Sequence, residues 1–501
     1  MRLLIFHGYL LHGTGSNVYN ANLAAALRRL GHEVHLLCQD RAAAELEFVD
    51  AIGDWDAGEL RVRALREPVR CTVYRPPIGR LLPVYVADRY EGFDARPFPE
   101  LTEQQLEHYL DRNVAAVRDV VARAAPEGAL ANHLVMGPVI LARALGGAAP
   151  YAVKIHGSAL EYTVKPHPRF LPYAREGLAG AAAVLVGSRH TAQSLWAALG
   201  EQGLQARTRL GPPGVDVHTF GPRAAVEARA GLERLRREFA ALAAQAPVVA
   251  AESSFAADPA AAHAALGRLD PDSDRLVAYV GKLLPGKGVD LLLLAWPLVL
   301  AAVPEALLLV VGFGDHGAAL RRLADDLAAG DLDAAQRAAG VLSPPSVAFI
   351  ARLGGERRER YLAVAATAGQ RISFTGRLSH EQLADLLPLA EAQVVPSVFP
   401  ESFGMVAAEA AACGALPIVA EHSGLAEVAA ALGSGLDAPF AALLSFPLDA
   451  AAVPVLAERL IAWLRTPAQE RERTRQTLVA TVRERYSWEG VARGVLAAVV
   501  G

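Results

Sequence analysis

Residues 396–414 read PSVFPESFGMVAAEAAACG. They begin inside the apolar run AQVVPSV at 392–398, which is typical of a buried strand. The alanines predict a helix over residues 403–412, for which Ser402 is the expected N-cap and Gly414 the terminator. A strand that passes through a short loop into a helix is the unit of parallel α/β sheets, so this stretch indicates an α/β fold.

The same stretch carries two glutamates eight positions apart, Glu401 before the helix and Glu409 about two turns inside it. The first N–H groups of a helix lack intrahelical partners, so those of Phe403, Gly404 and Met405 would face an anion. The two carboxylates would then accept hydrogen bonds from hydroxyls at opposite ends of a ligand whose phosphate lies between them. That is the shape of a nucleotide-sugar. The alternative is that Glu401 only favours the helix dipole and Glu409 pairs with an arginine.

The segment YVGKLLPGKGVDLLLLA predicts a strand that ends at Gly281, a loop with Lys282 and Lys287, and a helix. Only four of the 49 basic residues are lysines, so two lysines in one loop stand out. The spacing is not that of a P-loop. Two point cations at the end of a strand suit a diphosphate whose departure is stabilised without a metal ion. Lysines that merely face solvent are the alternative.

Two further glycine-containing loops follow predicted strands. VVGFGDHG contains Gly314, and HGTGSN at 12–17 contains Gly13 and Gly15. Small residues let backbone N–H groups approach an anion at a helix N-terminus. A dinucleotide fingerprint would need a third glycine where Val18 stands, so NAD binding and a tight turn without a ligand are the alternatives for 12–17.

Apolar runs alternate with helical segments along the chain, as in RLLIFHG followed by a helix at 17–31. The Pro/Gly-rich segment 211–221 marks a domain boundary. We therefore expect an α/β protein of two doubly wound, Rossmann-like domains whose strand-end loops face each other across a cleft. The expected domains are residues 1–215 and 216–485, with helical insertions near 222–273 and 319–370.

Composition narrows the class of protein. The chain has 501 residues, 52% hydrophobic and 20% charged, which suffices for two packed cores, and its net charge of -4 argues against nucleic acid as a partner. The three cysteines lie far apart without metal-ligand spacing, which suits a reducing cytoplasm.

The most apolar window of the sequence is residues 291–312. Prolines and a glutamate divide it into apolar runs shorter than the about 20 residues that a membrane-spanning helix needs. The N-terminus is predicted to be a strand rather than a signal peptide. Peripheral membrane contact and self-association stay open.

Six segments form a set: PESFGMVAAEAAACGALPIVAEHSGLAEV, GKLLPGKGVDLLL, PPGVDVHTF, FTGRLSHEQLADLL, RYSWEGVA and GTGSNVYNANLAAALRRLGHEVHLL. Together they resemble the landmarks of the retaining, family-4-type glycosyltransferases of the GT-B fold, including the E-x7-E region and the G-R-L-x-x-x-K-G segment of that family. The resemblance covers most of the chain except the two expected insertions. It also implies that a C-terminal helix at 486–501 crosses back onto the first domain.

By this resemblance, Glu401 would contact hydroxyls of the donor sugar and Glu409 the ribose of the nucleotide. Lys282 and Lys287 would neutralise the diphosphate, and His156, in the segment KIHGS, would lie over the donor sugar. Lys282 stands where the family usually has arginine, so it would contact phosphate as a point charge. The other donor-side positions would be Gly13, Gly15, Gly281, Gly314, Phe403, Gly404 and Met405, and the acceptor-side positions Asn17, Tyr19 and His133.

The resemblance implies a retaining, metal-independent transfer of a hexosyl unit from a nucleoside-diphosphate sugar to a hydroxyl acceptor, without a cofactor. Two alternatives are a sugar-nucleotide epimerase of the same fold and a non-catalytic protein that binds nucleotide-sugars. The sequence leaves open the base of the donor, the hexose and the acceptor.

Overall fold

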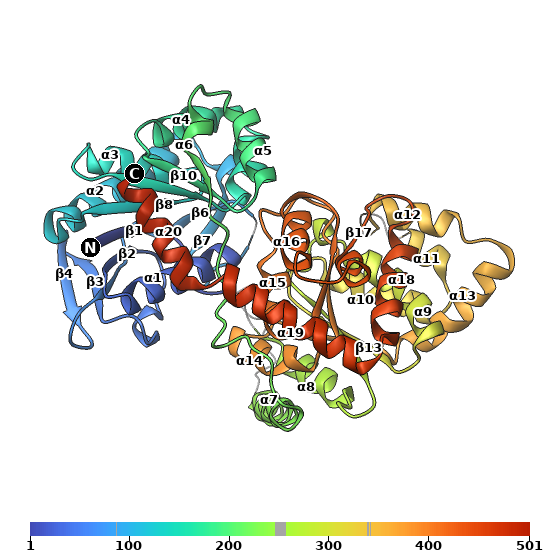
Figure 1. Ribbon diagram of the computed structural model, residues 1–501. Helices are drawn as coiled ribbons and strands as arrows, with labels where there is room; N and C mark the ends of the chain where they lie inside the picture. The colour runs from blue at the N-terminus through green and yellow to red at the C-terminus, as the bar shows by residue number, and fades with distance from the viewer. Residues whose placement is uncertain (87, 246–256, 338–339, 341) are drawn as a thin grey trace. The chain divides into compact units, whose positions relative to one another are not determined.

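The computed structural model of the chain describes residues 1–86, 88–245, 257–337, 340 and 342–501. The chain divides into two compact units, residues 1–214 with 486–501 and residues 215–485. We call them unit 1 and unit 2. Each is built on a mainly parallel sheet with helices packed against it, as the alternating sequence pattern predicts (Figure 1).

The described part of unit 1 has a main sheet of nine strands in the order β11-β10-β9-β8-β1-β2-β5-β3-β4. Strand β1 pairs in parallel with both β2 and β8, so the strand order reverses between β1 and β8. Ligands of doubly wound sheets bind at such a switch point, beyond the carboxyl ends of the strands. The strands are β1 (Arg2–Phe6), β2 (Glu33–Leu37), β3 (Ala51–Asp56), β4 (Glu59–Ala64), β5 (Cys71–Tyr74), β8 (Gly128–Asn132), β9 (Tyr151–Ile155), β10 (Ala183–Val186) and β11 (Thr208–Leu210), with β6 (Leu81–Val84) and β7 (Asp94–Pro97) as a separate pair.

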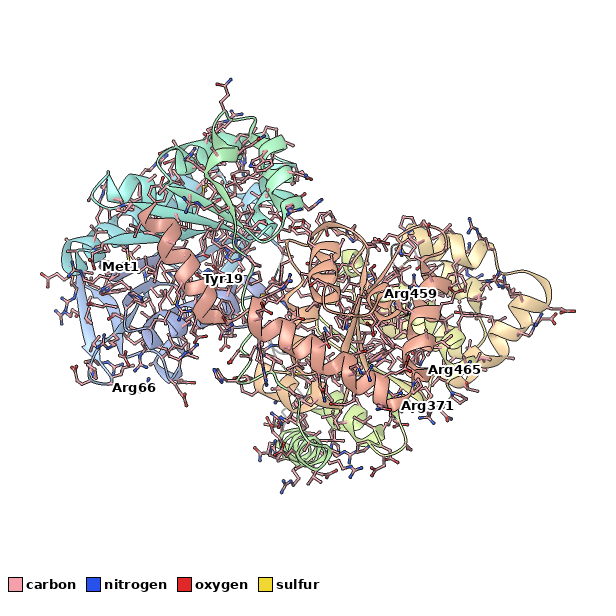
Figure 2. All side chains as sticks on the ribbon, in the orientation of Figure 1. Met1, Tyr19, Arg66, Arg371, Arg459 and Arg465 are labelled. Carbon is pink, nitrogen blue, oxygen red and sulfur yellow. The ribbon has the colours of Figure 1, made fainter. Side chains whose placement is uncertain are left out.

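The helices of unit 1 include the last one of the chain, α20, which packs on α1 (Figure 1). Trp488 of α20 meets Tyr19 of α1 edge-on, with the ring centroids 5.4 Å apart, and Tyr19 is labelled beside α20 in Figure 2. Helix α1 begins at Gly15, two residues before the predicted start. The helices are α1 (Gly15–Arg29), α2 (Glu103–Ala124), α3 (Gly137–Leu145), α4 (Leu171–Ala179), α5 (Arg189–Leu199), α6 (Leu204–Arg207) and α20 (Trp488–Val500), with short turns η1 (Ala43–Glu45), η2 (Phe98–Glu100), η3 (Ala159–Val164) and η4 (Pro168–Phe170).

Unit 2 has a parallel sheet in the order β14-β13-β12-β15-β16-β17, with its switch point between β12 and β15. The strands are β12 (Arg275–Val280), β13 (Ala306–Val311), β14 (Ile372–Gly376), β15 (Ala392–Val395), β16 (Leu416–Ala420) and β17 (Ser445–Phe446). The described helices are α7 (Ala225–Gln245), α8 (Pro259–Arg268), α9 (Val289–Ala302), α10 (Gly317–Ala328), α11 (Leu332–Arg337), α12 (Pro344–Ala351), α13 (Gly355–Ala368), α14 (His380–Leu386), α15 (Met405–Ala412), α16 (Ser423–Gly433), α17 (Ala438–Ala441), α18 (Ala452–Arg465) and α19 (Ala468–Arg485), with turns η5 (Pro285–Lys287), η6 (Leu387–Leu389) and η7 (Ala442–Leu444).

The two segments expected to be insertions are helical where the structure describes them. Helices α7 and α8 pack against each other, and α8 also packs on β14, whereas α12 and α13 pack on α9. Residues 246–256, 338–339 and 341, which fall within these segments, lie outside the described residues. Asp290 ties α12 to α9, because its Oδ2 accepts hydrogen bonds at 2.6 Å from the N–H and Oγ of Ser343 and from the Oγ of Ser346.

The most apolar window of the sequence forms a buried helix and a buried strand. Helix α9 is buried along most of its length and carries Pro297, and β13 follows it with all six residues buried. Within the described ranges, no helix combines the length and the hydropathy needed to cross a lipid bilayer.

Candidate active site

Three strand-end loops of unit 2 meet at its switch point. The N–H of Leu283, after β12, donates to the carbonyl of Phe313, after β13, at 2.6 Å. The N–H groups of Val398 and Phe399, after β15, both donate to the carbonyl of Gly286 at 3.0 Å. These bonds join loops that are far apart in sequence, and they place Gly281, Lys282, Lys287, Gly314 and Glu401, all predicted site residues, on one connected set of loops.

Glycines allow this close approach of backbones. A Cβ on Gly288, where φ is +63°, would lie 2.0 Å from the carbonyl oxygen of Pro396. A Cβ on Gly314, where φ is +141°, would lie 2.5 Å from the carbonyl oxygen of Leu283. Both positions combine a backbone conformation that favours glycine with space that only glycine fits. The glycines therefore shape the loops themselves.

Lys287 and Glu401 form an ion pair between the β12 and β15 loops. The Lys287 ammonium donates to Glu401 Oε1, and the Ser397 hydroxyl donates to the same oxygen at 2.7 Å. Burial raises the pKa of Glu401. This effect is outweighed by the charge and hydrogen bond of Lys287, by the hydrogen bond from Ser397 and by the charge of His422, so the pKa is lowered overall. Glu401 is therefore a carboxylate with a cation beside it.

The backbone of Glu401 is held by the first two residues of α16. Its N–H donates to Ser423 Oγ at 3.0 Å, and its carbonyl accepts from the N–H of Gly424 at 2.9 Å. A Cβ on Gly424 would lie 2.6 Å from the carbonyl oxygen of Ser402, so the start of α16 touches the β15 loop. His422 Nε2 lies 2.6 Å from the carbonyl oxygen of Ser397, to which it donates. We did not single out His422, Ser423 or Gly424 from the sequence.

The start of α15 corrects one prediction. The helix begins at Met405, and its N-cap is Gly404 at φ +104°, so the prediction of Ser402 as N-cap was wrong. The physical reason is tertiary: Gly404 turns in the left-handed region, and a Cβ there would lie 2.6 Å from Leu425 Cδ2. Of the three residues predicted to offer helix N–H groups, only Met405 lies in the helix, while Phe403 and Gly404 belong to the loop.

Glu409 is buried on α15, with 5% of its surface exposed. Its partner within the described residues is His380, whose Nε2 lies 3.7 Å from Oε1, and not the arginine that the sequence suggested as an alternative. Burial lowers the pKa of His380, but the hydrogen bond and charge of Glu409 and the charge of Glu381 raise it overall. His380 opens α14, whose predicted Ser379–Gln382 capping box is present. His380 therefore keeps its proton to higher pH than an ordinary histidine, because Glu409 lies beside it.

The Lys282 side chain extends over an aromatic ring of the neighbouring loop. Its ammonium lies 5.9 Å from the ring centroid of Phe313, and its carbonyl accepts from the Tyr279 hydroxyl at 2.8 Å. Lys282 thus faces the β13 loop, whereas Lys287 pairs with the β15 loop.

Unit 1 places a buried polar network at its own switch point. His156 Nε2 lies 2.8 Å from Asn132 Oδ1, and Asn132 Nδ2 donates to Asn20 Oδ1 at 2.8 Å. Asn20 Nδ2 lies 3.0 Å from His7 Nδ1, and His7 Nε2 lies 2.9 Å from Asn17 Oδ1. We call these five residues the amide–imidazole chain. It joins two predicted residues, Asn17 and His156, through three that the sequence did not single out.

Tyr19 and His133 both contact His156 and are both buried. The Tyr19 ring lies edge-on to His156 at 5.0 Å between centroids, and the His133 ring lies at 4.9 Å. His133 has φ +69°, and neither of its ring nitrogens has a hydrogen-bond partner among the described residues. Burial, and next the charge of His7, lower the pKa of His133 well below its usual value.

The glycine-rich loop after β1 is tied down by Asp40. The carboxylate accepts from the N–H of Leu11 at 2.8 Å and lies 3.1 Å from His12 Nδ1. Gly13 follows at φ +92°, and Gly15 opens α1. Asp40, three residues after β2, is 2% exposed, and its carboxylate is occupied by this loop.

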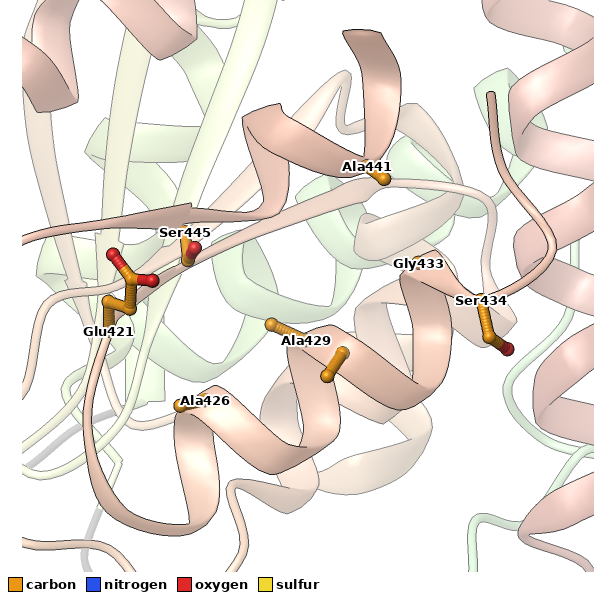
Figure 3. A pocket seen from close by; sticks show the side chains of 8 residues that line it. Glu421, Ala426, Ala429, Gly433, Ser434, Ala441 and Ser445 are labelled. Atoms are coloured by element: carbon orange, nitrogen blue, oxygen red, sulfur yellow. The ribbon is translucent and has the colours of Figure 1, made fainter. Parts of the chain in front are cut away.

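A separate cavity of about 290 Å³ lies beside α16 in unit 2 (Figure 3). Its lining consists of Glu421, Ala426, Ala429, Ala430, Gly433, Ser434, Ala441 and Ser445. None of these residues was predicted as a site residue. The opposite face of α16, with Leu425 and Val428, packs on Gly404 at the start of α15.

Two family models match successive parts of the chain. Residues 14–210 match the glycosyl transferase 4-like domain, and residues 268–473 match the glycosyl transferases of group 1. The first match falls in unit 1 and the second in unit 2.

Curated relatives match part of the chain. A D-inositol 3-phosphate glycosyltransferase of Segniliparus rotundus is 32% identical over 241 residues, which are 48% of this chain and 42% of the relative. A GDP-mannose-dependent monoacylated alpha-(1-6)-phosphatidylinositol monomannoside mannosyltransferase of Corynebacterium glutamicum is 29% identical over 171 residues, 33% of this chain and 34% of the relative. The matched part thus spans less than half the length of these curated relatives.

Solved structures resemble the whole chain. A sucrose-phosphate synthase of Thermosynechococcus elongatus aligns with a TM-score of 0.59 and 20% identity over 99% of each chain. The Anabaena protein HepE, solved in complex with UDP and glucose, aligns with a TM-score of 0.58 and 13% identity over 100% of each chain. At such identities the likeness concerns the fold alone, and it confirms the predicted GT-B fold.

Proposed function

We propose that this chain, which belongs to the glycosyl transferases of group 1, moves a hexosyl unit from a nucleoside-diphosphate sugar to a hydroxyl acceptor. The transfer would retain the anomeric configuration and need no metal ion or other cofactor. The observation that carries the proposal is the Lys287–Glu401 ion pair at the switch point of unit 2, next to the first turn of α15.

The ion pair suits the chemistry because it combines one group for the diphosphate with one for the sugar. Lys287 would turn from Glu401 towards the donor phosphates, and Lys282 would add a second cation on the same loop. The N–H groups at the start of α15 lie at the positive end of the helix and would receive the remaining phosphate charge. Glu401, released from Lys287 but still bonded to Ser397, would accept hydrogen bonds from hydroxyls of the sugar.

The reaction would depend mainly on stabilising the departing diphosphate. The bond between the anomeric carbon and the phosphate oxygen breaks, and a bond from the same carbon to the acceptor oxygen forms on the same face. The acceptor's proton passes to the leaving phosphate, so no enzyme base is needed. Glu409 would accept hydrogen bonds from the ribose while its Oε1 stays beside His380 Nε2.

The names of the curated relatives direct the search for an acceptor. Both describe transfer onto inositol-containing acceptors, D-inositol 3-phosphate in one case and a phosphatidylinositol mannoside in the other. We therefore propose an inositol or another polyol, free or phosphorylated, as the acceptor class to test first.

A thermal-shift screen with UDP-, GDP- and ADP-sugars tests the donor. We expect one base series to raise the melting temperature, because a ligand that binds only the folded state stabilises it by RT ln(1 + [L]/Kd). The stabilising donor is then incubated with inositol and inositol phosphates, with and without EDTA, and the product is analysed by NMR. Loss of turnover with EDTA would contradict metal independence, and a β-linked product from an α-linked donor would contradict retention.

The same assay separates the two alternatives. An epimerase would convert the donor to its epimer or release free nucleotide without any acceptor. A non-catalytic binding protein would be stabilised by a donor that it never turns over.

A further inference from the structure

The amide–imidazole chain fixes the orientation of its side-chain amides as well as their positions. Each of its three amides has an Nδ2 that donates to a backbone carbonyl: Asn17 to His12 at 2.6 Å, Asn20 to Ser16 at 2.8 Å and Asn132 to Phe6 at 3.1 Å. A carbonyl oxygen can only accept, so each amide nitrogen must face its carbonyl. Turning over any one amide would set two oxygen atoms against each other.

The amide orientations determine the tautomer of His7. Asn20 presents its NH2 group to Nδ1, so Nδ1 must accept. Nε2 faces two acceptors, Asn17 Oδ1 at 2.9 Å and the carbonyl oxygen of Leu10 at 3.0 Å, so Nε2 must carry the proton. A proton on Nδ1 as well would oppose the Asn20 amide. This agrees with the pKa of His7, which burial lowers to about 4 against smaller opposing effects of its hydrogen bonds.

The same reasoning applies to His156 at the other end of the amide–imidazole chain. Asn132 uses its Nδ2 on Phe6 and Asn20, so only Oδ1 is left for His156. His156 Nε2 must therefore donate, and the neutral ring carries its proton on Nε2. The members that link the two histidines are fully buried: Asn20 is 0% and Asn132 1% exposed. Water therefore does not offer alternative partners for their amides.

The groups around His156 disfavour its charged form. His133 follows β8, Lys154 lies on β9, His7 follows β1, and Tyr19 of α1 lies edge-on to the ring. Burial lowers the pKa of His156 well below its usual value, and the charges of His133, Lys154 and His7 lower it further.

We propose that His7, Asn20 and Asn132 are positioning residues that hold His156 as a neutral imidazole protonated at Nε2. In the proposed reaction His156 therefore takes part as a neutral ring with an accepting Nδ1, and it does not supply a proton from Nδ1 to the leaving group or the sugar. The role of His156 in transfer rests on the proposed function, whereas its tautomer does not.

The test is NMR of the full chain labelled with ¹⁵N in its histidine rings, without ligand. His156 is assigned by the signals that vanish in a His156→Gln variant. We expect long-range ¹H–¹⁵N correlations of a neutral, Nε2-protonated ring throughout pH 5.5–8, a range in which an ordinary histidine with a pKa of about 6.5 changes charge. A ring protonated at Nδ1, or an imidazolium at pH 6, would overturn the proposal. This measurement on the wild-type chain needs no activity, so it stands even if no donor is ever turned over.

Two variants test the positioning role. Asn132→Ala removes the acceptor of His156 Nε2, so we expect both tautomers to appear and kcat to fall about tenfold or more, with a smaller change in the KM for the donor; tenfold corresponds to about 1.4 kcal/mol. Asn113→Ala is the matched control, because Asn113 is an equally buried amide whose Nδ2 donates to the Tyr109 carbonyl at 2.8 Å, outside the chain. A single unchanged tautomer in Asn132→Ala would contradict the proposal. If that variant does not fold, the wild-type spectrum still decides the tautomer.

Discussion

Lys287 and Glu401 form an ion pair, and the proposed mechanism gives this pairing a consequence for catalysis. The pair is only half-buried, and the charge of Lys287 is the main influence that keeps the pKa of Glu401 low. In the proposed mechanism the donor would replace Glu401 as the partner of Lys287. Binding would then exchange one charge-assisted contact for another, so ground-state binding would gain little from Lys287. The full effect of Lys287 would fall in the transition state, where the diphosphate gains negative charge.

Lys287→Ala should therefore lower kcat/KM more than it weakens donor binding. Loss of one hydrogen bond to a charged group costs about 1.5–3 kcal/mol, which corresponds to about 10- to 150-fold in kcat/KM. Steady-state kinetics with the donor found in the thermal-shift screen measure it. Lys165→Ala is the control, since Lys165 is an exposed lysine paired with Glu161 four residues away. Wild-type turnover in a folded Lys287→Ala variant would rule out the proposed role.

The His380–Glu409 pair predicts a pH dependence of stability. The folded-state pKa of His380 is raised, so its contribution to stability is complete below the ordinary histidine pKa of about 6.5 and is lost as pH rises through the raised value. The difference in unfolding free energy between wild type and His380→Gln should be largest below about pH 6 and should shrink at higher pH. Urea denaturation between pH 5.5 and 8.5 measures this difference.

His263→Gln serves as the control for this pH series. His263 is an exposed histidine on α8, so its replacement controls for the loss of a histidine elsewhere in unit 2. A His380→Gln difference that grows with pH would have the opposite sign and would exclude a cationic His380 beside Glu409.

At the scale of elements, the loops at the switch point of unit 2 depend on backbone contacts that only glycine permits. Gly288→Ala would place a Cβ 2.0 Å from the Pro396 carbonyl oxygen at a φ of +63°. We expect it to destabilise unit 2 by about 1–3 kcal/mol and to impair donor binding, because the β12 and β15 loops must separate. Denaturant titration and thermal shift with the donor check both effects.

Gly267→Ala is the matched substitution for this test. Gly267 lies within α8, its φ is not positive, and a Cβ there meets no atom within 4 Å. Gly267 is the second-last residue of α8, so alanine there should stabilise the protein by less than the about 0.5–1 kcal/mol expected in a helix interior. Equal effects of the two substitutions would show that the packing of Gly288 on Pro396 does not matter.

Elements that depend on neighbours in sequence could be predicted, and those that depend on distant contacts could not. The capping box of α14 and the buried helix α9 depend on neighbours in sequence, and both are present. The N-cap of α15 was mispredicted because the left-handed turn at Gly404 is set by Leu425, more than twenty positions away. The local pattern around Ser402 contains no trace of that contact.

The residues of the candidate site divide in the same way, into those that the sequence marks and those that it does not. Lys287 and Glu401 could be singled out because charges are rare within apolar, glycine-containing segments, and their proposed roles stay predictions. Asn20, Asn132 and His380 could not be singled out, since nothing near them in sequence marks them. Their partners come from other strands and helices, which only the assembled sheet brings within hydrogen-bonding distance.

At the scale of the whole molecule, the chain leaves unit 1 at residue 214 and returns to it at residue 486. The returning helix α20 is part of the fold of unit 1. Trp488 is 3% exposed, and its ring carbons would lie within 3.0 Å of a Cβ on Gly214. Arg29 of α1 adds an ion pair with Glu489 at 2.8 Å. The last residues of the chain therefore stabilise the first ones.

Trp488→Ala should accordingly destabilise unit 1 selectively. Truncation of a buried tryptophan costs about 3–5 kcal/mol, and we expect faster hydrogen exchange in peptides from 1–214 and 486–501. Trp463→Ala is the matched variant in unit 2. Trp463 of α18 is 0% exposed, and its Nε1 donates to the Glu391 carbonyl at 2.7 Å. It should speed exchange in peptides from 215–485. If both variants speed exchange equally in both sets of peptides, the two units unfold as one, and α20 does not belong energetically to unit 1 alone.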